Sequence, residues 1–271
     1  MIKDVTIGQY FPGKSFLHKL DARTKLILVF FVLVFIFLCK NFYSLLLVSV
    51  FSVLCVAVSR IPVRSMMKGF KTIFFIIILT SLLQIFYNHD GETLFAWKKL
   101  QITTGGVNTA IFICVRIVCL IFVTSLLTYT TSPTLLTDGI ERLFKPLKIF
   151  HIESHTVAMM MTIALRFIPT LIEEVDHIMS AQKARGANME TGGLLKRAKA
   201  LVPVLVPLFV NSFRRAYELA YAMECRCYRG GSGRTRMRIM KLGVRDYIAF
   251  AIAALMLAGI ILLNTFFEAV I

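Results

Sequence analysis

The sequence predicts an all-α integral membrane protein with about five transmembrane helices and a cytoplasmic segment of about three long helices. Of the 271 residues, 57% are hydrophobic and only 17% are charged. The mean hydropathy is +0.75, and ordinary soluble domains carry about 25% charged residues. The apolar residues also gather in long runs, which a globular core of this size could not bury completely. We therefore expect lipid to cover much of the surface.

Five apolar stretches are long enough, or nearly long enough, to cross a membrane, because a helix needs roughly 17–25 residues to span about 30 Å of hydrocarbon. Lys40-Asn41 interrupts what is otherwise one long apolar run, and this break predicts a tight helical hairpin. Arg23 and Lys25 lengthen the first span if their charged ends reach the lipid headgroups. The expected spans are Ala22–Cys39, Phe42–Val58, Gly69–Tyr87, Val107–Thr130 and Tyr247–Phe267.

Basic residues alternate between the predicted loops and so orient the chain. Five Lys and Arg residues lie before or within the first turn of the first span, four lie between the second span and the first turn of the third, and eighteen lie in residues 131–245. The other loops hold only Lys40, Lys98 and Lys99, and Arg116 is expected to face the helix bundle or water inside the fourth span. Positive residues stay on the cytoplasmic side. The N-terminus and residues 131–245 are therefore expected in the cytoplasm and the C-terminus outside, and the net charge of +16 reflects topology and not a nucleic-acid surface.

The predicted organisation has three parts. Residues 1–130 hold an N-terminal cytoplasmic segment and four transmembrane helices, residues 131–245 hold the cytoplasmic helices, and residues 246–271 hold the last transmembrane helix. Pro203 and Pro207 each remove a backbone hydrogen bond from the third cytoplasmic helix. Capping residues and stop signals place the three cytoplasmic helices at about residues 133–145, 154–184 and 194–228.

Two stretches of the cytoplasmic segment, Thr156–Ile172 and Ala200–Phe213, are apolar enough to raise the question of further crossings. The second has only about fourteen residues, which is short for a span. We expect instead that these helices lie along or below the inner face of the membrane. Crossing there would place five basic residues outside, against the positive-inside rule, namely Lys183, Arg185, Lys196, Arg197 and Lys199.

The sequence offers few groups for catalysis or metal binding. His151 and His155 are four residues apart, but without the glutamate placement of the zinc motif H-E-x-x-H. The thiols of Cys225 and Cys227 have no further ligands nearby, so we expect no metal site. The sequence contains no Walker A pattern, and residues 8–13 lack the spacing of a phosphate loop. We therefore expect a chain that is not an enzyme and that binds no cofactor itself.

Two short segments share one pattern at the ends of the second and third cytoplasmic helices. Ala184-Arg185-Gly186 closes the second helix, and Cys225-Arg226-Cys227 nearly closes the third. In each, a cation stands between small side chains, which let the backbone of a partner approach while the guanidinium binds a carboxylate. The helix macrodipole alone also favours arginine at a C-terminus. The spacing does not decide between these two explanations.

Together with these tripeptides, several longer segments resemble the transmembrane (T) component of energy-coupling factor (ECF) transporters. This EcfT/CbiQ-like family belongs to prokaryotic importers of vitamins and transition-metal ions, and the resemblance covers nearly the whole chain. The second tripeptide departs from the family's Ala-Arg-small pattern, because Cys225 replaces alanine and Cys227 is the small residue. The other matching segments are Gly8–Ser15, Leu17–Lys25, Arg166–Pro169 and Ala222–Gly231.

The resemblance implies a non-catalytic coupling subunit in the prokaryotic plasma membrane. Two cytoplasmic ABC ATPase subunits would bind ATP and Mg, and a small membrane subunit, the S component, would bind a vitamin or ion. The cytoplasmic helices would form a coupling domain whose tripeptides dock on the ATPases, and ATPase closure would reorient the S component. Candidate S-component contacts on the apolar helix faces are Met159, Met160, Met161, Leu205 and Leu208.

Two other classes of function remain open from the residues alone. A stand-alone secondary transporter or channel would move solute without ATPases, although such carriers usually place ionisable groups at mid-membrane. A membrane-embedded hydrolase would need the histidine pair or a cysteine to be catalytic. In an ECF transporter the S component sets the cargo, so this sequence names neither the vitamin nor the ion.

Overall fold

A computed structural model describes residues 10–87, 92–97, 100–144, 154–187, 193–230 and 242–267 and is almost entirely helical. The chain divides into two compact units. Residues 8–139 and 240–271 form one unit, which we call the bundle, and residues 1–7 and 140–239 form the other. The second unit contains two long helices, α6 and α7, that carry the arginine tripeptides at their ends. We call these two helices the α6–α7 pair.

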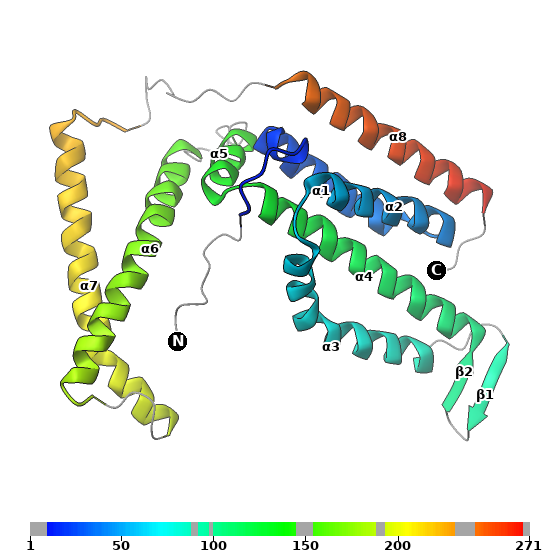
Figure 1. Cartoon of the computed structure of the whole chain (residues 1–271), viewed down its shortest axis with the longest axis horizontal. Coiled ribbons are helices and arrows are strands. Elements are labelled where there is room, and N and C mark those ends of the chain that lie inside the picture. The colour runs from blue at the N-terminus through cyan, green and yellow to red at the C-terminus, as the bar shows by residue number, and fades with distance from the viewer. Residues whose placement is uncertain are drawn as a thin grey trace. The chain divides into compact units, whose positions relative to one another are not determined.

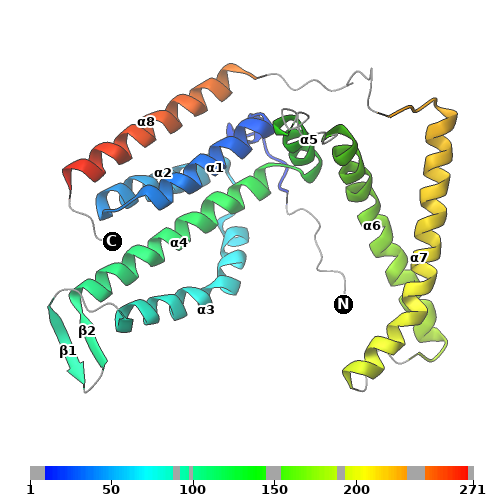
Figure 2. The same ribbon diagram turned by 180° about the vertical axis from the view of Figure 1, so that it is seen from behind.

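The bundle confirms the predicted helical segments. Each expected span corresponds to one helix, and the ends agree closely except at the start of α3, which begins six residues earlier than expected. Figures 1 and 2 show α1, α2, α4 and α8 running side by side. The helices are η1 (Leu17–Lys19), α1 (Ala22–Leu38), α2 (Phe42–Ser59), α3 (Val63–Tyr87), α4 (Thr104–Thr130), α5 (Pro133–Leu143) and α8 (Val244–Phe266). The division between the two units falls within α5.

Length and composition make several of these helices able to cross a membrane. Among the described residues, α2, α4 and α8 are long and apolar enough, and Ile73–Tyr87 of α3 is a shorter apolar helix. The 17 residues of α1 are also apolar. By the same two criteria Thr156–Ala184 also qualifies, although only 6% of its apolar window is buried inside the protein. The chain is therefore an all-α membrane protein with additional helices.

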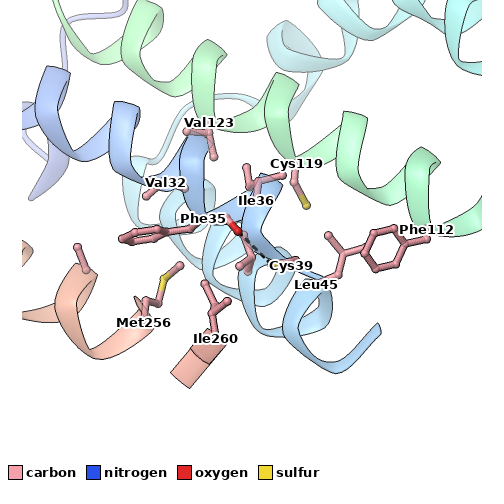
Figure 3. Packing of buried hydrophobic residues seen from close by; sticks show 12 residues of the cluster. Val32, Phe35, Ile36, Cys39, Leu45, Phe112, Cys119, Val123, Met256 and Ile260 are labelled. Carbon is pink, nitrogen blue, oxygen red and sulfur yellow. Dashed lines mark hydrogen bonds between the residues drawn. The ribbon is translucent and has the colours of Figure 1, made fainter. Parts of the chain in front are cut away.

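The bundle core lies where α1, α2, α4 and α8 meet (Figure 3). Ile36 of α1, Val48 of α2 and Phe112 of α4 have no exposed surface, and Ile260 of α8 is 1% exposed. The ring of Phe42 packs edge-on against Phe112 with centroids 5.5 Å apart. Burying side chains of this size contributes about 1.5–3 kcal/mol each where the alternative is water. Beside lipid, tight packing rather than transfer from water holds the helices together.

The predicted hairpin at Lys40-Asn41 is present, and buried amides fasten it to the end of α8. Asn41 is 1% exposed, and its Nδ2 donates to the carbonyl oxygens of Leu263 at 3.0 Å and Phe267 at 2.8 Å. In return, Asn264 Nδ2 donates to the carbonyl oxygen of Leu38 at 2.8 Å. The Leu263 carbonyl also accepts the backbone N–H of Phe267, and the side-chain amides thus add partners to carbonyl groups at the ends of α1 and α8.

The other end of α8 is fastened by a carboxylate. Asp246 is 4% exposed, and its Oδ1 accepts the backbone N–H of Asp21 at 3.0 Å. Its Oδ2 accepts the N–H of Gly243 at 2.8 Å, which caps the start of α8. The Asp21 side chain in turn accepts the N–H of Arg23 and caps α1. One buried carboxylate thus joins the beginnings of two helices that are far apart in the sequence.

A short β-hairpin between α3 and α4 was not expected from the sequence. Strands β1 (Thr93–Trp97) and β2 (Leu100–Thr103) pair antiparallel, with Trp97 opposite Leu100. The two strands contain β-branched and aromatic residues that favour extended backbone. Each strand has only four or five residues, which is too short a pattern to stand out between two long apolar helices.

Arg116 faces the bundle, as expected. It lies half-buried in α4, and its NH2 group donates to the carbonyl oxygen of Cys39 at 2.7 Å. The guanidinium carbon lies 4.7 Å from the centroid of the Phe112 ring, a distance at which a cation and an aromatic face attract. The side chain therefore supports the end of α1 from within the helix bundle.

Candidate functional site

The α6–α7 pair is an antiparallel pair of long helices, α6 (Ser154–Ala184) and α7 (Leu194–Cys225). The end of α6 lies beside the early part of α7, and the two helices diverge toward the start of α6 and the end of α7, where the Tyr228 side chain bridges them (Figure 1). Three polar contacts connect them in sequence: Tyr228 Oη donates to Met159 Sδ at 3.1 Å, Arg215 pairs with Glu174 at 2.6 Å, and Gln182 Nε2 donates to the carbonyl oxygen of Pro203 at 3.4 Å.

The end of α6 is a Schellman motif with arginine at the C-cap. The N–H of Ala187 donates to the carbonyl of Gln182 at 3.0 Å, and the N–H of Gly186 donates to the carbonyl of Lys183 at 3.0 Å. Gly186 has a φ of +86°, the left-handed conformation that this motif requires and that glycine adopts without steric cost. Arg185 is therefore the last residue before the chain turns away.

The end of α7 repeats the same motif. The N–H of Tyr228 donates to the carbonyl of Met223 at 3.0 Å, and the N–H of Cys227 donates to the carbonyl of Glu224 at 2.8 Å. Cys227 has a φ of +57°, so a residue with a side chain occupies the left-handed position. That conformation costs a residue other than glycine roughly 1–2 kcal/mol. Arg226 holds the C-cap position.

The two tripeptides thus present arginine in one and the same local geometry. All six of their residues, Ala184, Arg185, Gly186, Cys225, Arg226 and Cys227, are exposed. Among the residues that the structure describes, no hydrogen bond or ion pair engages the guanidinium of Arg185 or Arg226. Each guanidinium, with its five donors, is open to an acceptor from outside the chain.

The two arginines lie at opposite ends of the helix pair. Arg226 comes just before Tyr228, which contacts Met159 near the start of α6, whereas Arg185 ends α6 itself. Along α6 the distance from Met159 to Gln182 is about 35 Å at 1.5 Å rise per residue. The pair therefore places two identical cationic tips far apart on one helical body.

Prolines shape both helices of the pair. Pro169 lies inside α6, and Pro203 and Pro207 lie inside α7. Each proline lacks the N–H that would donate to a carbonyl of the preceding turn, and its ring clashes with that carbonyl. Figure 1 shows that α7 changes direction along its length, as proline kinks produce. Val204, between the two prolines, is only 3% exposed.

The candidate apolar contacts are divided between the interior and the surface of the pair. Met160, Met161 and Leu205 are exposed by 57%, 42% and 45%. Leu208 and Met159 are half-buried, and Met159 already accepts the hydroxyl of Tyr228. Other large apolar residues of α7 are also exposed, namely Val202, Val206, Phe209, Val210, Phe213, Tyr217 and Tyr221.

Sequence reasoning missed the polar clamp at the middle of the pair. Glu174 also accepts a hydrogen bond from Asn211 Nδ2, and the Glu174 side chain is only 13% exposed. Glu174 and Arg215 are 41 residues apart, and nothing in the sequence around either one indicates that they pair. Only the antiparallel packing of the two helices brings Glu174, Asn211 and Arg215 together.

The structure also bears on the thiol and histidine candidates. Cys225 and Cys227 are free, exposed thiols. Within the described part of the chain, no group of three or more His, Cys, Asp or Glu side chains is placed to hold a metal ion. His151 lies outside the described residues, and so does the side chain of His155.

Comparisons with known proteins agree over nearly the whole chain. The family model described as cobalt transport protein, CbiQ, matches residues 13–237. A protein of Clostridium kluyveri named energy-coupling factor transporter transmembrane protein EcfT is 52% identical over 265 residues, which are 97% of this chain and 98% of that protein. A protein of the same name from Ruminiclostridium cellulolyticum is 48% identical, over 98% of this chain and 100% of that protein. One from Bacillus subtilis is 47% identical, over 88% of this chain and 90% of that protein. The family match includes both arginine tripeptides.

Proposed function

The chain belongs to the CbiQ family of cobalt transport proteins, and from this membership we propose that it is the transmembrane coupling subunit of an ECF-type ABC importer. In this role it joins two cytoplasmic ABC ATPase subunits to a membrane S component that binds a vitamin or micronutrient. ATP and Mg bind to the ATPases, and this chain transmits their movement without catalysing hydrolysis. The relatives named as transmembrane proteins of energy-coupling factor transporters support the proposal.

One observation carries the mechanism. Arg185 and Arg226 hold the same C-cap position in the same helix-ending motif, at opposite ends of one antiparallel pair. The macrodipole explains an arginine at one helix end, but it requires neither the matched motif nor the exposure of both guanidinium groups. Two identical tips about 35 Å apart along α6 suit a partner that has two equivalent acidic sites, as a pair of ATPase subunits would.

The pair also suits the transmission of movement. The ion pair between Glu174 and Arg215 and the contact between Tyr228 and Met159 hold α6 and α7 together between the two tips. A displacement of one tip is then passed along helices rather than absorbed by a flexible loop. In this scheme residues 131–245 are the coupling domain on the cytoplasmic side, with the N-terminus on that side and the C-terminus outside the plasma membrane.

The exposed apolar face of the pair is the proposed contact with the S component. Met160 and Met161 are exposed near the start of α6, and Leu205 is exposed in the early part of α7, at the other end of the pair; Met159 and Leu208 beside them are partly buried. The apolar stretch of α6 is long enough to cross a membrane but is only 6% buried, so most of it is left for lipid or a partner. Methionine suits a surface that repacks as the partner tilts.

The experiment is uptake by the complete complex reconstituted in liposomes with its ATPases and S component. Replacing Arg185 and Arg226 by alanine removes one partner from each desolvated charge pair, at a cost of roughly 3–5 kcal/mol apiece. We expect the double variant to insert into the membrane normally, to lose its ATPases on purification and to show no ATP-driven uptake. Arg214→Ala, an exposed arginine on the side of α7, is the matched control and should retain both.

Two results would count against this function. Normal uptake by the Arg185→Ala, Arg226→Ala double variant would show that the tips are not the docking points. Solute flux through the purified chain alone, without ATPases, would support a secondary transporter or channel instead. The histidine pair offers a third check, because His151→Ala with His155→Ala should leave uptake unchanged if the chain is not a hydrolase.

A further inference from the structure

The bundle contains a cavity whose lining includes neither arginine tripeptide. It has a volume of about 640 Å³ and lies between the loop before α1 and the turn after α2. This volume is within the range of about 300–1,000 Å³ that small-molecule sites occupy. Its walls are formed by residues 11–16 and His18 on one side and by residues 57–61 on the other. We call it the Lys14–Arg60 cavity, after the cation that each wall contributes.

The first wall is a loop held in a defined shape. The N–H of Phe11 donates to the carbonyl of Tyr129 at the end of α4, at 3.0 Å. His18 Nε2 is 3.0 Å from the Phe11 carbonyl oxygen, and Ser15 Oγ is 2.7 Å from His18 Nδ1. Gly13 packs so closely on the His18 ring that a Cβ there would lie 2.7 Å from it. The loop is therefore fixed from both of its ends, and it carries Lys14 beside the cavity.

The second wall of the cavity holds Arg60 in a backbone conformation that is unfavourable for arginine. Arg60 is the C-cap of α2 and has a φ of +56°, the left-handed region. Asparagine and glycine adopt this conformation far more readily than arginine does. The turn is fixed on either side, because the Ser59 hydroxyl donates to the Val56 carbonyl and accepts the N–H of Ile61. A strained residue held in place by its surroundings points to a function for its side chain.

The chemistry of the lining indicates the ligand. Lys14 and Arg60 are both exposed, and the described residues around the cavity include no acidic side chain. The same walls carry apolar groups, with Val58 48% exposed and Phe11 and Phe16 each 37% exposed. Because α2 is long and apolar enough to span a membrane and ends immediately before Arg60, a membrane crossing by α2 would place the cavity at the level of the lipid headgroups. Two cations beside apolar walls at this depth suit a phosphate that is joined to a hydrophobic body.

We propose that the Lys14–Arg60 cavity binds the phosphate of an anionic phospholipid. Lys14 and Arg60 bind the phosphate oxygens from opposite walls, and the glycerol and the first acyl carbons lie along Val58 and Phe16. Free inorganic phosphate shares the charged part of this chemistry but would leave the apolar walls without a contact. The site is separate from the arginine tripeptides, so its test does not depend on the coupling function.

Native mass spectrometry of the full chain tests the proposal. The chain, purified in detergent, is titrated with dioleoylphosphatidylglycerol, with dioleoylphosphatidylcholine, or with inorganic phosphate. We expect one phosphatidylglycerol to be retained in preference to phosphatidylcholine. Lys14→Gln and Arg60→Gln should each weaken retention about fivefold, since one cation at a membrane surface contributes about that factor. Lys19→Gln removes an exposed cation of the same segment that is not in the cavity lining, and it should leave retention unchanged.

A second substitution at Arg60 separates charge from backbone. Arg60→Gly relieves the left-handed strain and removes the cation, so it should fold at least as well as the unmodified chain and still lose phosphatidylglycerol about fivefold. Retention by the Lys14→Gln, Arg60→Gln double variant equal to that of the unmodified chain would overturn the proposal. Thermal stabilisation by inorganic phosphate without retention of phosphatidylglycerol would overturn the assignment to a lipid.

Discussion

Arg215 of α7 lies 2.6 Å from Glu174 of α6, and this ion pair sits between the two helix ends that carry Arg185 and Arg226. The Glu174 side chain is 13% exposed and the Arg215 side chain 35% exposed. Asn211 adds a hydrogen bond to the same carboxylate. The contact is thus a partly buried, charge-assisted clamp between helices, which contributes more than an ion pair on an open surface.

The first prediction concerns this clamp. Glu174→Ala removes the ion-pair partner of Arg215 and the hydrogen-bond acceptor of Asn211, and we expect the α6–α7 pair to lose about 1–3 kcal/mol of stability. Hydrogen exchange of backbone amides in the middle of α6 and α7 measures the loss directly. Glu173→Ala removes an exposed acid at the neighbouring position and should change stability by less than about 0.5 kcal/mol. Equal protection in the two variants would show that the clamp contributes nothing.

The two helix-ending motifs predict opposite effects at equivalent positions. Gly186→Ala places a Cβ at a φ of +86° and should destabilise the last turn of α6 by about 1–2 kcal/mol. Cys227→Gly relieves a φ of +57° and should stabilise the last turn of α7 by about 0.5–1 kcal/mol. Local hydrogen exchange at each helix end reads both effects. Gly193→Ala, at the N-cap of α7 with open space around it and no positive φ, is the comparison and should cost less than Gly186→Ala, because it loses only the capping preference for glycine.

A charge on the exposed apolar face should separate the two proposed partners. Met160→Glu places a carboxylate at a position that is 57% exposed. Burying it against an apolar partner costs several kcal/mol, so we expect the S component to be lost. A pull-down from cells that express all subunits should retain the ATPases while losing the S component. Thr170→Glu adds the same charge at another exposed position of α6 and should change neither. An unchanged complex with Met160→Glu would remove this face from consideration.

His18 makes the loop before α1 sensitive to pH. Burial lowers the pKa of His18 below its ordinary 6.5; the hydrogen bond to the Phe11 carbonyl opposes this shift, and the charge of Lys25 adds to it. The unfolded chain therefore binds more protons than the folded chain between the lowered pKa of the folded state and about pH 6.5. The contribution of His18 to stability is full above that pH and decreases as the pH falls toward the lowered pKa of the folded state.

The measurement is the unfolding temperature of the chain in detergent from about pH 7.5 to about pH 5. We expect the unmodified chain to lose more stability over this range than His18→Gln, which does not titrate there. The difference between the two curves isolates His18 from the other titrating groups. Parallel curves would mean that protonating this imidazole does not disturb the loop.

Much of the fold was predictable because its signals are local. Long apolar runs bounded by polar and capping residues predicted the helices of the bundle, and Lys40-Asn41 predicted the hairpin between α1 and α2. The end of α6 was predictable for the same reason, since a glycine after a long amphipathic pattern is a stop signal. The break after α7 was also placed correctly within a few residues.

The remaining features depend on contacts between distant segments. Nothing in the sequence around Asn41 or Asp246 shows that they meet α8 and the start of α1, respectively. The pairing of Glu174 with Arg215 depends on the register of two helices, which periodicity does not determine. The left-handed φ of Cys227 was equally hidden, because a cysteine carries no turn signal. The Lys14–Arg60 cavity exists only because a loop and a helix end meet in three dimensions.

Because α8 is bonded at both of its ends to segments near the N-terminus, the bundle can be completed only after α8 has been synthesised. The two carbonyl partners of Asn41 are 222 and 226 residues further along the chain. At a synthesis rate of about 5–20 residues per second, the ribosome needs roughly 10–45 s to reach them. During that interval the α1–α2 hairpin has already been translated, whereas the segment that provides the partners of Asn41 has not. The hairpin therefore gains its final contacts with α8 only when translation of the chain is nearly complete.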